Sequence, residues 1–129
     1  MVVDSSALLA ILQMEPEADR FLATLHGSRR LLMSAANLLE TAIVIGSRRG
    51  RGGWQDLDEL IDGAGIVVEA VARRHVLIAR EAYQEYGRGN HPAGLNFGDC
   101  FAYALAKERD LPLLYKSDDF SRTDIRAAG

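Results

Sequence analysis

The chain has 129 residues, of which 48% are hydrophobic and 26% are charged, a balance that is typical of one globular domain and excludes a disordered chain. The formal net charge of −3 gives no overall signature of nucleic-acid binding, although Arg48, Arg49 and Arg51 cluster locally. The lone Cys100 excludes an intrachain disulfide, and no run approaches the roughly 18 apolar residues that cross a membrane, so we expect a cytoplasmic protein.

Short apolar runs alternate with helical patterns along the chain. The clearest strand is Ile66 to Val71, because it is rich in β-branched residues and follows a glycine. Helical stretches begin at capping residues such as Ser5 and Asn96, and several end near glycines. In chain order we predict a strand over 1–4, helices over 5–12 and 16–27, a strand over 31–33, helices over 34–46 and 54–62, a strand over 66–71, a helix over 73–86, a loop over 87–94, a helix over 96–110 and a strand over 113–115.

Strands that alternate with one or two helices predict an α/β protein, in which helices cover both faces of a parallel sheet. Residues 1–129 contain neither an internal repeat nor a linker, so we expect a single domain. In open parallel sheets, ligands gather beyond the carboxyl ends of the strands. That edge is therefore where we look for a site.

Three acidic residues stand in otherwise apolar segments. Asp4 ends the opening apolar run, Glu40 interrupts a helical run, and Asp99 precedes another apolar helix. Burying an unpaired carboxylate is costly, so each needs a partner, a proton or a cation. If the fold brings the three together, their mutual repulsion makes a divalent metal ion the natural partner. The pattern therefore predicts a metal-dependent hydrolase.

The predicted topology allows these acids to meet. Asp4 lies at the carboxyl end of the first strand, and Asp99 lies in the first turn of a helix that starts at the same edge. Glu40 is further along its helix and must reach back with its longer side chain. Structural alternatives exist, since Asp4 could cap the first helix, and Asp99 could form a reciprocal capping box with Asn96.

Further candidates follow the last strand. Asp118 and Asp119 lie at the same predicted edge, and we prefer Asp118 as the fourth site residue, with Asp119 forming a turn. Lys116 could contact a phosphate or remain a surface lysine. The histidines lack the spacing of a zinc site. Apolar residues of the early helices could line a groove for a partner helix or fill the core: Leu8, Leu12, Phe21 and Leu25.

Several of these segments resemble the PIN-domain toxins of the VapC type. The resemblance rests on the Asp-x-Ser opening, the helical Glu40, and the segments 95–104 and 111–125, and it spans essentially the whole chain. It implies a three-layer α/β/α domain with a central, mainly parallel sheet of four to five strands. It also implies a Mg²⁺- or Mn²⁺-dependent endoribonuclease that acts as the toxin of a toxin–antitoxin system.

The resemblance further implies roles for particular residues and partners. Asp4 and Asp99 correspond to the metal-binding acids, Glu40 completes the acidic cluster, and Ser6 matches a supporting hydroxyl residue. The implied partners are an RNA substrate, a cognate VapB-like antitoxin and a second copy in a homodimer. The chain departs from the pattern at Ser117, where glycine or asparagine is common, and in the paired acids that follow it.

Two other functions fit parts of the pattern. A housekeeping RNA-processing nuclease would use the same acids and the same metal. A Mg²⁺-binding receiver-like signalling domain would need a phosphorylatable aspartate at the end of the central strand. Here the strand Ile66 to Val71 is followed by Ala72, Arg73 and Arg74, and this departs from the receiver pattern.

Overall fold

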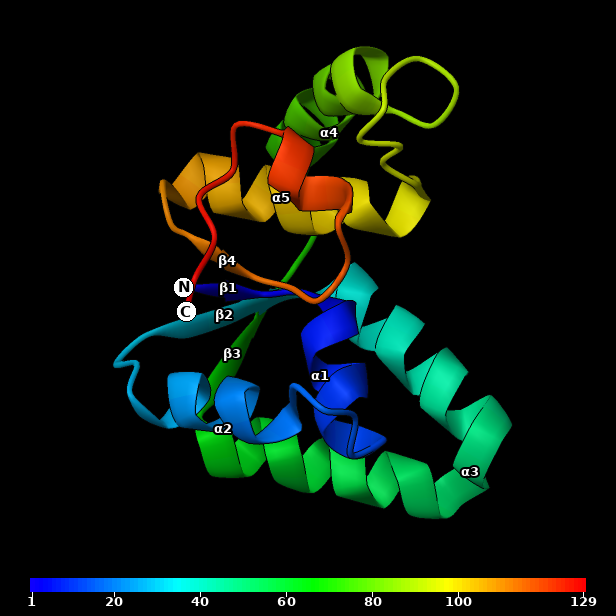
Figure 1. The fold of residues 1–129 in the computed structure, drawn as a ribbon, viewed down its shortest axis with the longest axis vertical. Coiled ribbons are helices and arrows are strands. Elements are labelled where there is room, and N and C mark those ends of the chain that lie inside the picture. Colours follow the sequence, from blue (N-terminus) through cyan, green and yellow to red (C-terminus); the bar gives the residue numbers. More distant parts are fainter.

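A four-stranded parallel sheet lies at the centre of the computed structural model, which describes residues 1–129 (Figure 1). The strand order is β3-β2-β1-β4, and the strands are β1 (Val2–Val3), β2 (Leu31–Ser34), β3 (Ile66–Glu69) and β4 (Leu113–Leu114). In β1, Val2 pairs with Leu32 on one side and with Leu113 on the other. The prediction of a parallel sheet is confirmed.

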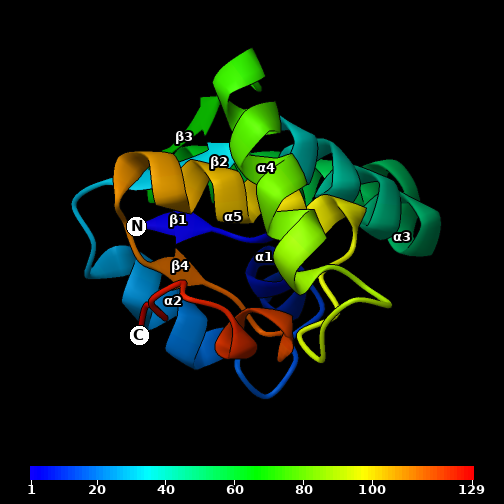
Figure 2. The same cartoon turned by 90° about the horizontal axis from the view of Figure 1, so that it is seen from above.

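Helices cover both faces of this sheet. The helices are α1 (Ser5–Leu12), α2 (Ala18–His26), α3 (Ala35–Ala64), α4 (Arg73–Tyr86), α5 (Phe97–Arg109) and the short 3₁₀ helix η1 (Asp119–Arg122). Helices α1, α2 and the second half of α3 lie on one face, and α5 lies on the other with α4 packed over it (Figures 1 and 2). The architecture is therefore the expected three-layer α/β/α arrangement.

Successive side chains of the short strands point to opposite faces of the sheet, and the hydrophobic core therefore has two parts. Val3 and Leu114 pack with the side chains of α1, α2 and α3. Val2 and Leu113 point the opposite way and pack with α5 and Phe120. Strands β1, β2 and β4 are thus buried on both faces, and this explains why they read as continuous apolar runs, whereas Val67 and Val68 of the edge strand β3 are exposed.

The early apolar residues that could have lined a groove belong to this core. Leu8, Phe21 and Leu25 are at most 1% exposed, and Leu12 is 9% exposed. All four pack in the cluster between the sheet and helices α1, α2 and α3. The hypothesis that they form an open partner groove is therefore wrong. No helix combines the length and the apolar character that a membrane span requires.

The glycine-rich segment 50–53 differs from its prediction. We expected two helices separated by a turn, whereas α3 runs from Ala35 to Ala64 with a sharp bend (Figure 1). The bend is at Gly50, whose φ of 62° and ψ of −149° are not helical. Glycine adopts this conformation readily because it lacks a Cβ atom. The two halves of α3 fold back on each other around it.

Trp54 links the two halves of α3 on either side of this bend. Its indole Nε1–H donates to the carbonyl oxygen of Ala42 at 2.8 Å, across the two halves of α3. A Cβ atom at Gly46 would lie 2.6 Å from the same nitrogen, which is closer than real contacts allow. Gly46 therefore provides the room in which the indole ring packs.

Replacing Gly46 with alanine is expected to lower the free energy of unfolding by about 1–2 kcal/mol, because the added methyl group displaces the indole ring. Gly63→Ala is the matched control, since a Cβ there meets nothing within 4 Å. That change should stabilise the chain by up to about 1 kcal/mol through helix propensity alone. Urea denaturation of both variants measures the difference. Equal stabilisation by both would contradict the role assigned to Trp54.

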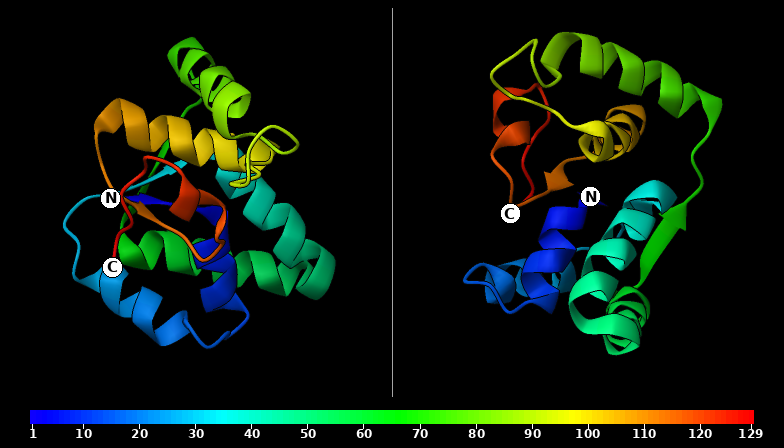
Figure 3. Two further views of the ribbon diagram at one scale, coloured as in Figure 1. Left: turned by 45° about the horizontal axis from the view of Figure 1, so that its top comes forward. Right: turned by 90° about the vertical axis from the view of Figure 1, so that its right-hand side faces the viewer.

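The C-terminal segment returns to the sheet. The backbone N–H of Leu113 donates to the carbonyl oxygen of Arg126, and the N–H of Ala128 donates to that of Leu113, each at 2.9 Å. An isolated parallel bridge joins Leu113 and Ala127 beside β4. The two chain ends consequently lie close together (Figure 3).

Candidate active site

Asp4 lies at the carboxyl edge of the sheet, between the ends of β1 and β4. Its backbone N–H donates to the carbonyl oxygen of Leu114 at 2.9 Å, and its side chain is only 4% exposed. One carboxylate oxygen, Oδ2, accepts hydrogen bonds from the backbone N–H of Ser6 at 3.0 Å and from Ser6 Oγ at 2.6 Å. Asp4 therefore does cap α1, and this cap holds its carboxylate at the sheet edge.

Asp99 lies in the first turn of α5 and is 7% exposed. Its backbone N–H donates to Asn96 Oδ1 at 2.9 Å, and its Oδ2 accepts from the backbone N–H of Asn96 at 3.0 Å. The reciprocal capping box that the sequence suggested is present. As with Asp4, the cap fixes a buried carboxylate in one orientation.

Glu40 reaches back to the same edge from α3. Its Oε1 accepts hydrogen bonds from Ser5 Oγ at 2.6 Å and from Asn37 Nδ2 at 3.3 Å. Its Oε2 lies so close to Gly98 that a Cβ atom at that glycine would overlap it. The carboxylate thus lies against Gly98 in the first turn of α5, the residue that precedes Asp99.

The carboxyl groups of this edge act on one another. Burial, followed by the negative charge of Glu40, raises the pKa of Asp4 to about 6 despite its hydrogen bonds from Ser6. Burial raises the pKa of Asp99 to about 8, aided by a hydrogen bond with the carboxyl group of Asp119 and by the charge of Asp4. The structure therefore brings Asp4, Glu40 and Asp99 into one electrostatically coupled cluster.

Of the two adjacent acids after β4, Asp119 rather than the preferred Asp118 contacts the cluster. Asp119 is half-buried at the start of η1 and contacts Asp99. Asp118 is exposed, and burial, followed by the charge of Asp118, raises the pKa of the Tyr115 hydroxyl. The structure therefore favours Asp119 over Asp118 as the fourth member of the acidic cluster.

Ser6 contacts the acidic cluster, whereas Lys116 pairs with acidic residues outside it. Ser6 Oγ accepts a hydrogen bond from the backbone N–H of Lys116 at 2.9 Å while it donates to Asp4, so it ties the end of β4 to the site. The Lys116 ammonium is held by Glu15 at 2.6 Å and by Glu17 at 3.2 Å. Because these carboxylates engage it outside the cluster, the structure favours the surface lysine among the two alternatives.

A divalent cation fits the chemistry of the cluster. No lysine or arginine pairs with Asp4, Glu40, Asp99 or Asp119, since the ion pairs of the chain involve other acids. No three acidic, cysteine or histidine side chains lie close enough to hold a metal ion by themselves. Mg²⁺, however, usually takes only one or two carboxylates, with waters and substrate phosphates as its other ligands. Asp4 and Asp99 suit that mode of binding.

Sequence reasoning overlooked Ser5, Asn37 and Gly98 as site residues. The sequence predicts only a helix-capping role for Ser5. The available signal was the position of Asn37 three residues before Glu40, on the same face of an otherwise apolar helix. Nothing in the sequence indicated that Gly98 would touch Glu40.

The fold and the site together define a class of protein. It is a small three-layer α/β/α domain with a buried acidic cluster at the carboxyl edge of a parallel sheet, which suits metal-dependent hydrolysis. Comparison with known families agrees, because the model of the PIN domain matches residues 1–126. The chain belongs to the PIN-domain family and, within it, to the VapC ribonucleases.

Curated relatives match nearly the whole chain. VapC ribonuclease Mb0640 of Mycobacterium bovis is 49% identical over 125 residues, which are 97% of this chain and 95% of that protein. Ribonuclease VapC of Mycolicibacterium smegmatis is 47% identical over 127 residues, covering 98% of both. Relatives of this length and identity establish the family.

Solved structures share the fold at low sequence identity. Mycobacterium tuberculosis VapC20, described as a sarcin-ricin loop cleaving toxin, superposes with a TM-score of 0.79 at 16% identity, covering 96% of this chain and 95% of that one. A chain of a toxin-antitoxin complex from Klebsiella pneumoniae gives a TM-score of 0.70 at 15% identity, with 95% and 92% coverage. These similarities support the architecture.

Proposed function

We propose that this chain is the toxin of a type II toxin–antitoxin pair and that it hydrolyses RNA with Mg²⁺ or Mn²⁺. The observation that carries the proposal is the cluster of buried carboxylates without a cationic partner, found in a chain 49% identical to a VapC ribonuclease. The RNA substrate implies a cytoplasmic site of action.

In this proposal Asp4 and Asp99 hold the ion, while Glu40 and Asp119 complete the negative site. When bound, such an ion polarises the scissile phosphate and lowers the pKa of a water molecule. The helix caps keep the Asp4 and Asp99 carboxylates in place before the ion and the substrate arrive. The cluster contains no cysteine or histidine nucleophile, so we expect water to attack and the products to carry a 5′-phosphate and a 3′-hydroxyl.

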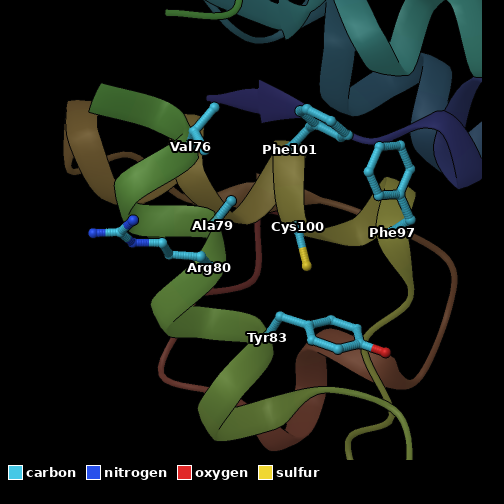
Figure 4. A pocket seen from close by; sticks show the side chains of 7 residues that line it. All are labelled: Val76, Ala79, Arg80, Tyr83, Phe97, Cys100 and Phe101. Carbon is cyan, nitrogen blue, oxygen red and sulfur yellow. The ribbon is translucent and has the colours of Figure 1, made fainter. Parts of the chain in front are cut away.

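The proposal includes two protein partners, an antitoxin and a second copy of the chain. Support for the antitoxin comes from the family and from the similar chain found in a toxin-antitoxin complex. For the homodimer, the support is an apolar hollow of about 520 Å³ between α4 and α5 (Figure 4). It is lined by Val76, Ala79, Arg80, Tyr83, Phe97, Cys100 and Phe101.

This hollow is part of a wider apolar surface. Phe97 and Phe101 also border a second hollow next to Glu40, where Leu39 and Ile43 of α3 lie. Phe97 is 79% exposed, Leu39 is 62% exposed and Ile43 is 61% exposed. Contiguous apolar surface of this kind marks interaction sites. We assign it to the second copy.

The proposal is tested by expressing the chain without a partner and by assaying the purified protein. We expect growth arrest on induction, and RNA cleavage in Mg²⁺ that EDTA stops and excess Mg²⁺ restores. Harmless expression of a protein that cleaves RNA would favour the housekeeping nuclease. Full cleavage in EDTA would refute the metal-dependent mechanism.

A further inference from the structure

The carboxylate of Glu40 is held by residues from three helices. Ser5 of α1 and Asn37 of α3 donate to its Oε1, and Gly98 of α5 lies against its Oε2. We propose that Ser5, Asn37 and Gly98 form a clamp that positions Glu40, and through α5 also Asp99, for the metal ion. This inference rests on the proposed function, because it assigns positioning residues to the same site.

Asn37 is the centre of the clamp. Its side chain is fully buried, and its Nδ2 donates to the carbonyl oxygen of Gly98 at 2.9 Å and to Glu40 Oε1 at 3.3 Å. Both of these groups accept hydrogen bonds, so the nitrogen of the amide must face them. Since Asp99 follows Gly98 directly, this one amide connects the two carboxylates.

The oxygen of the Asn37 amide indicates that a contribution to stability does not by itself explain why an asparagine occupies this position. Asn37 Oδ1 is buried and has no hydrogen-bond partner. A buried acceptor without a partner destabilises a fold, whereas an apolar side chain of similar size would avoid this cost. Asparagine at this position is therefore better explained by what its nitrogen holds than by packing.

Ser5 donates the second hydrogen bond to the Glu40 carboxylate. Its Oγ lies 2.6 Å from Glu40 Oε1 and 3.0 Å from the backbone carbonyl oxygen of Asn37. The hydroxyl has one proton, and the shorter contact to a charged oxygen takes it, because charge-assisted hydrogen bonds are the stronger ones. Glu40 Oε1 thus receives two donors, while Oε2 stays beside the first turn of α5.

Gly98 sets how closely α5 approaches. A Cβ atom there would overlap the Glu40 carboxyl group, so any larger residue would push Glu40 away or tilt α5. Exact placement of ligands by a surrounding shell commonly changes metal affinity or activity by about 10- to 100-fold. The clamp is expected to act on metal binding and turnover rather than on RNA affinity.

The experiment compares Ser5→Ala and Asn37→Leu with Ser47→Ala, which removes an exposed hydroxyl of α3 outside the cluster. Calorimetric titration with Mn²⁺ and steady-state kinetics on RNA are measured for each, and thermal melting verifies folding. We expect both clamp variants to bind Mn²⁺ about tenfold more weakly and to lose at least about tenfold in kcat, with KM within about twofold. Asn37→Leu removes the unpaired Oδ1 but also leaves the Gly98 carbonyl oxygen without its donor, so thermal melting decides whether this variant is folded.

Folded Ser5→Ala protein with parental Mn²⁺ affinity and kcat would overturn the clamp. Should Asn37→Leu fail to fold, Ser5→Ala decides alone, because it removes a single oxygen atom. Asp4→Asn distinguishes a failure of the clamp from a failure of the proposed metal site. If Asp4→Asn abolishes Mn²⁺ binding and Ser5→Ala does not weaken it, only the clamp fails. If Asp4→Asn leaves Mn²⁺ binding unchanged, the proposed site itself fails.

Discussion

Asp99→Asn is expected to abolish RNA cleavage, with a loss of at least about 10³-fold in initial rate and no loss of the fold. Asparagine keeps an oxygen that can accept the backbone N–H of Asn96, so the capping box at the start of α5 survives. What disappears is the negative charge that would bind the ion. Asp4→Asn should behave in the same way, since its oxygen can still accept from Ser6.

Thermal melting provides the second measurement for these variants. In metal-free buffer both should melt at or above the temperature of the parent chain, because each replaces a buried carboxylate with a neutral group. Asp62→Asn is the control, since Asp62 is exposed near the end of α3 and should keep both activity and stability. Comparable cleavage by Asp99→Asn and the parent, after identical purification, would contradict the assignment of the site.

The metal-free chain is expected to lose stability as the pH rises from about 6 to about 8.5, with a fall in melting temperature of roughly 10 °C. Burial raises the pKa of Asp4 to about 6 and that of Asp99 to about 8, so the folded chain holds protons that the unfolded chain has already released near its ordinary value of 3.8. The stability that these protons contribute is complete below about pH 4. It disappears as the pH passes the two raised values.

Melting curves in EDTA across this range measure the effect, and a parallel series in excess Mg²⁺ provides the comparison. A bound cation takes the place of the protons, so Mg²⁺ should flatten the decline. Asp124 and Glu108, whose pKa values are lowered by their hydrogen-bond partners, titrate below this range and do not contribute to it. A melting temperature that rises between pH 6 and pH 8.5 in EDTA would contradict the prediction.

The sheet could be predicted from the sequence because its strands are apolar on both sides. Ile66 to Glu69 and Leu31 to Ser34 form strands within a residue or two of their predicted bounds. The bend in α3 could not be predicted, because glycines at 50–53 suit a turn between helices as well as a kink within one. The outcome depends on Trp54 packing over Gly46, a contact between residues on opposite sides of the bend.

The three main acids could be predicted because a carboxylate in an apolar segment is conspicuous. Asp118 and Asp119 could not be separated by the same reasoning, since adjacent residues share their local sequence and only the direction of η1 turns one of them toward Asp99. The Lys116 side chain points toward Glu15 and Glu17, which are about a hundred residues away in the chain. The sequence alone does not reveal this contact.

The return of the last residues to the sheet has a practical consequence for work on this molecule. The C-terminal segment runs beside Leu113, at the start of β4, and Met1 immediately precedes β1. Both chain ends therefore emerge at the amino ends of the strands, opposite the acidic edge. An affinity tag or a fluorescent fusion at either end should therefore leave access to the proposed active site open.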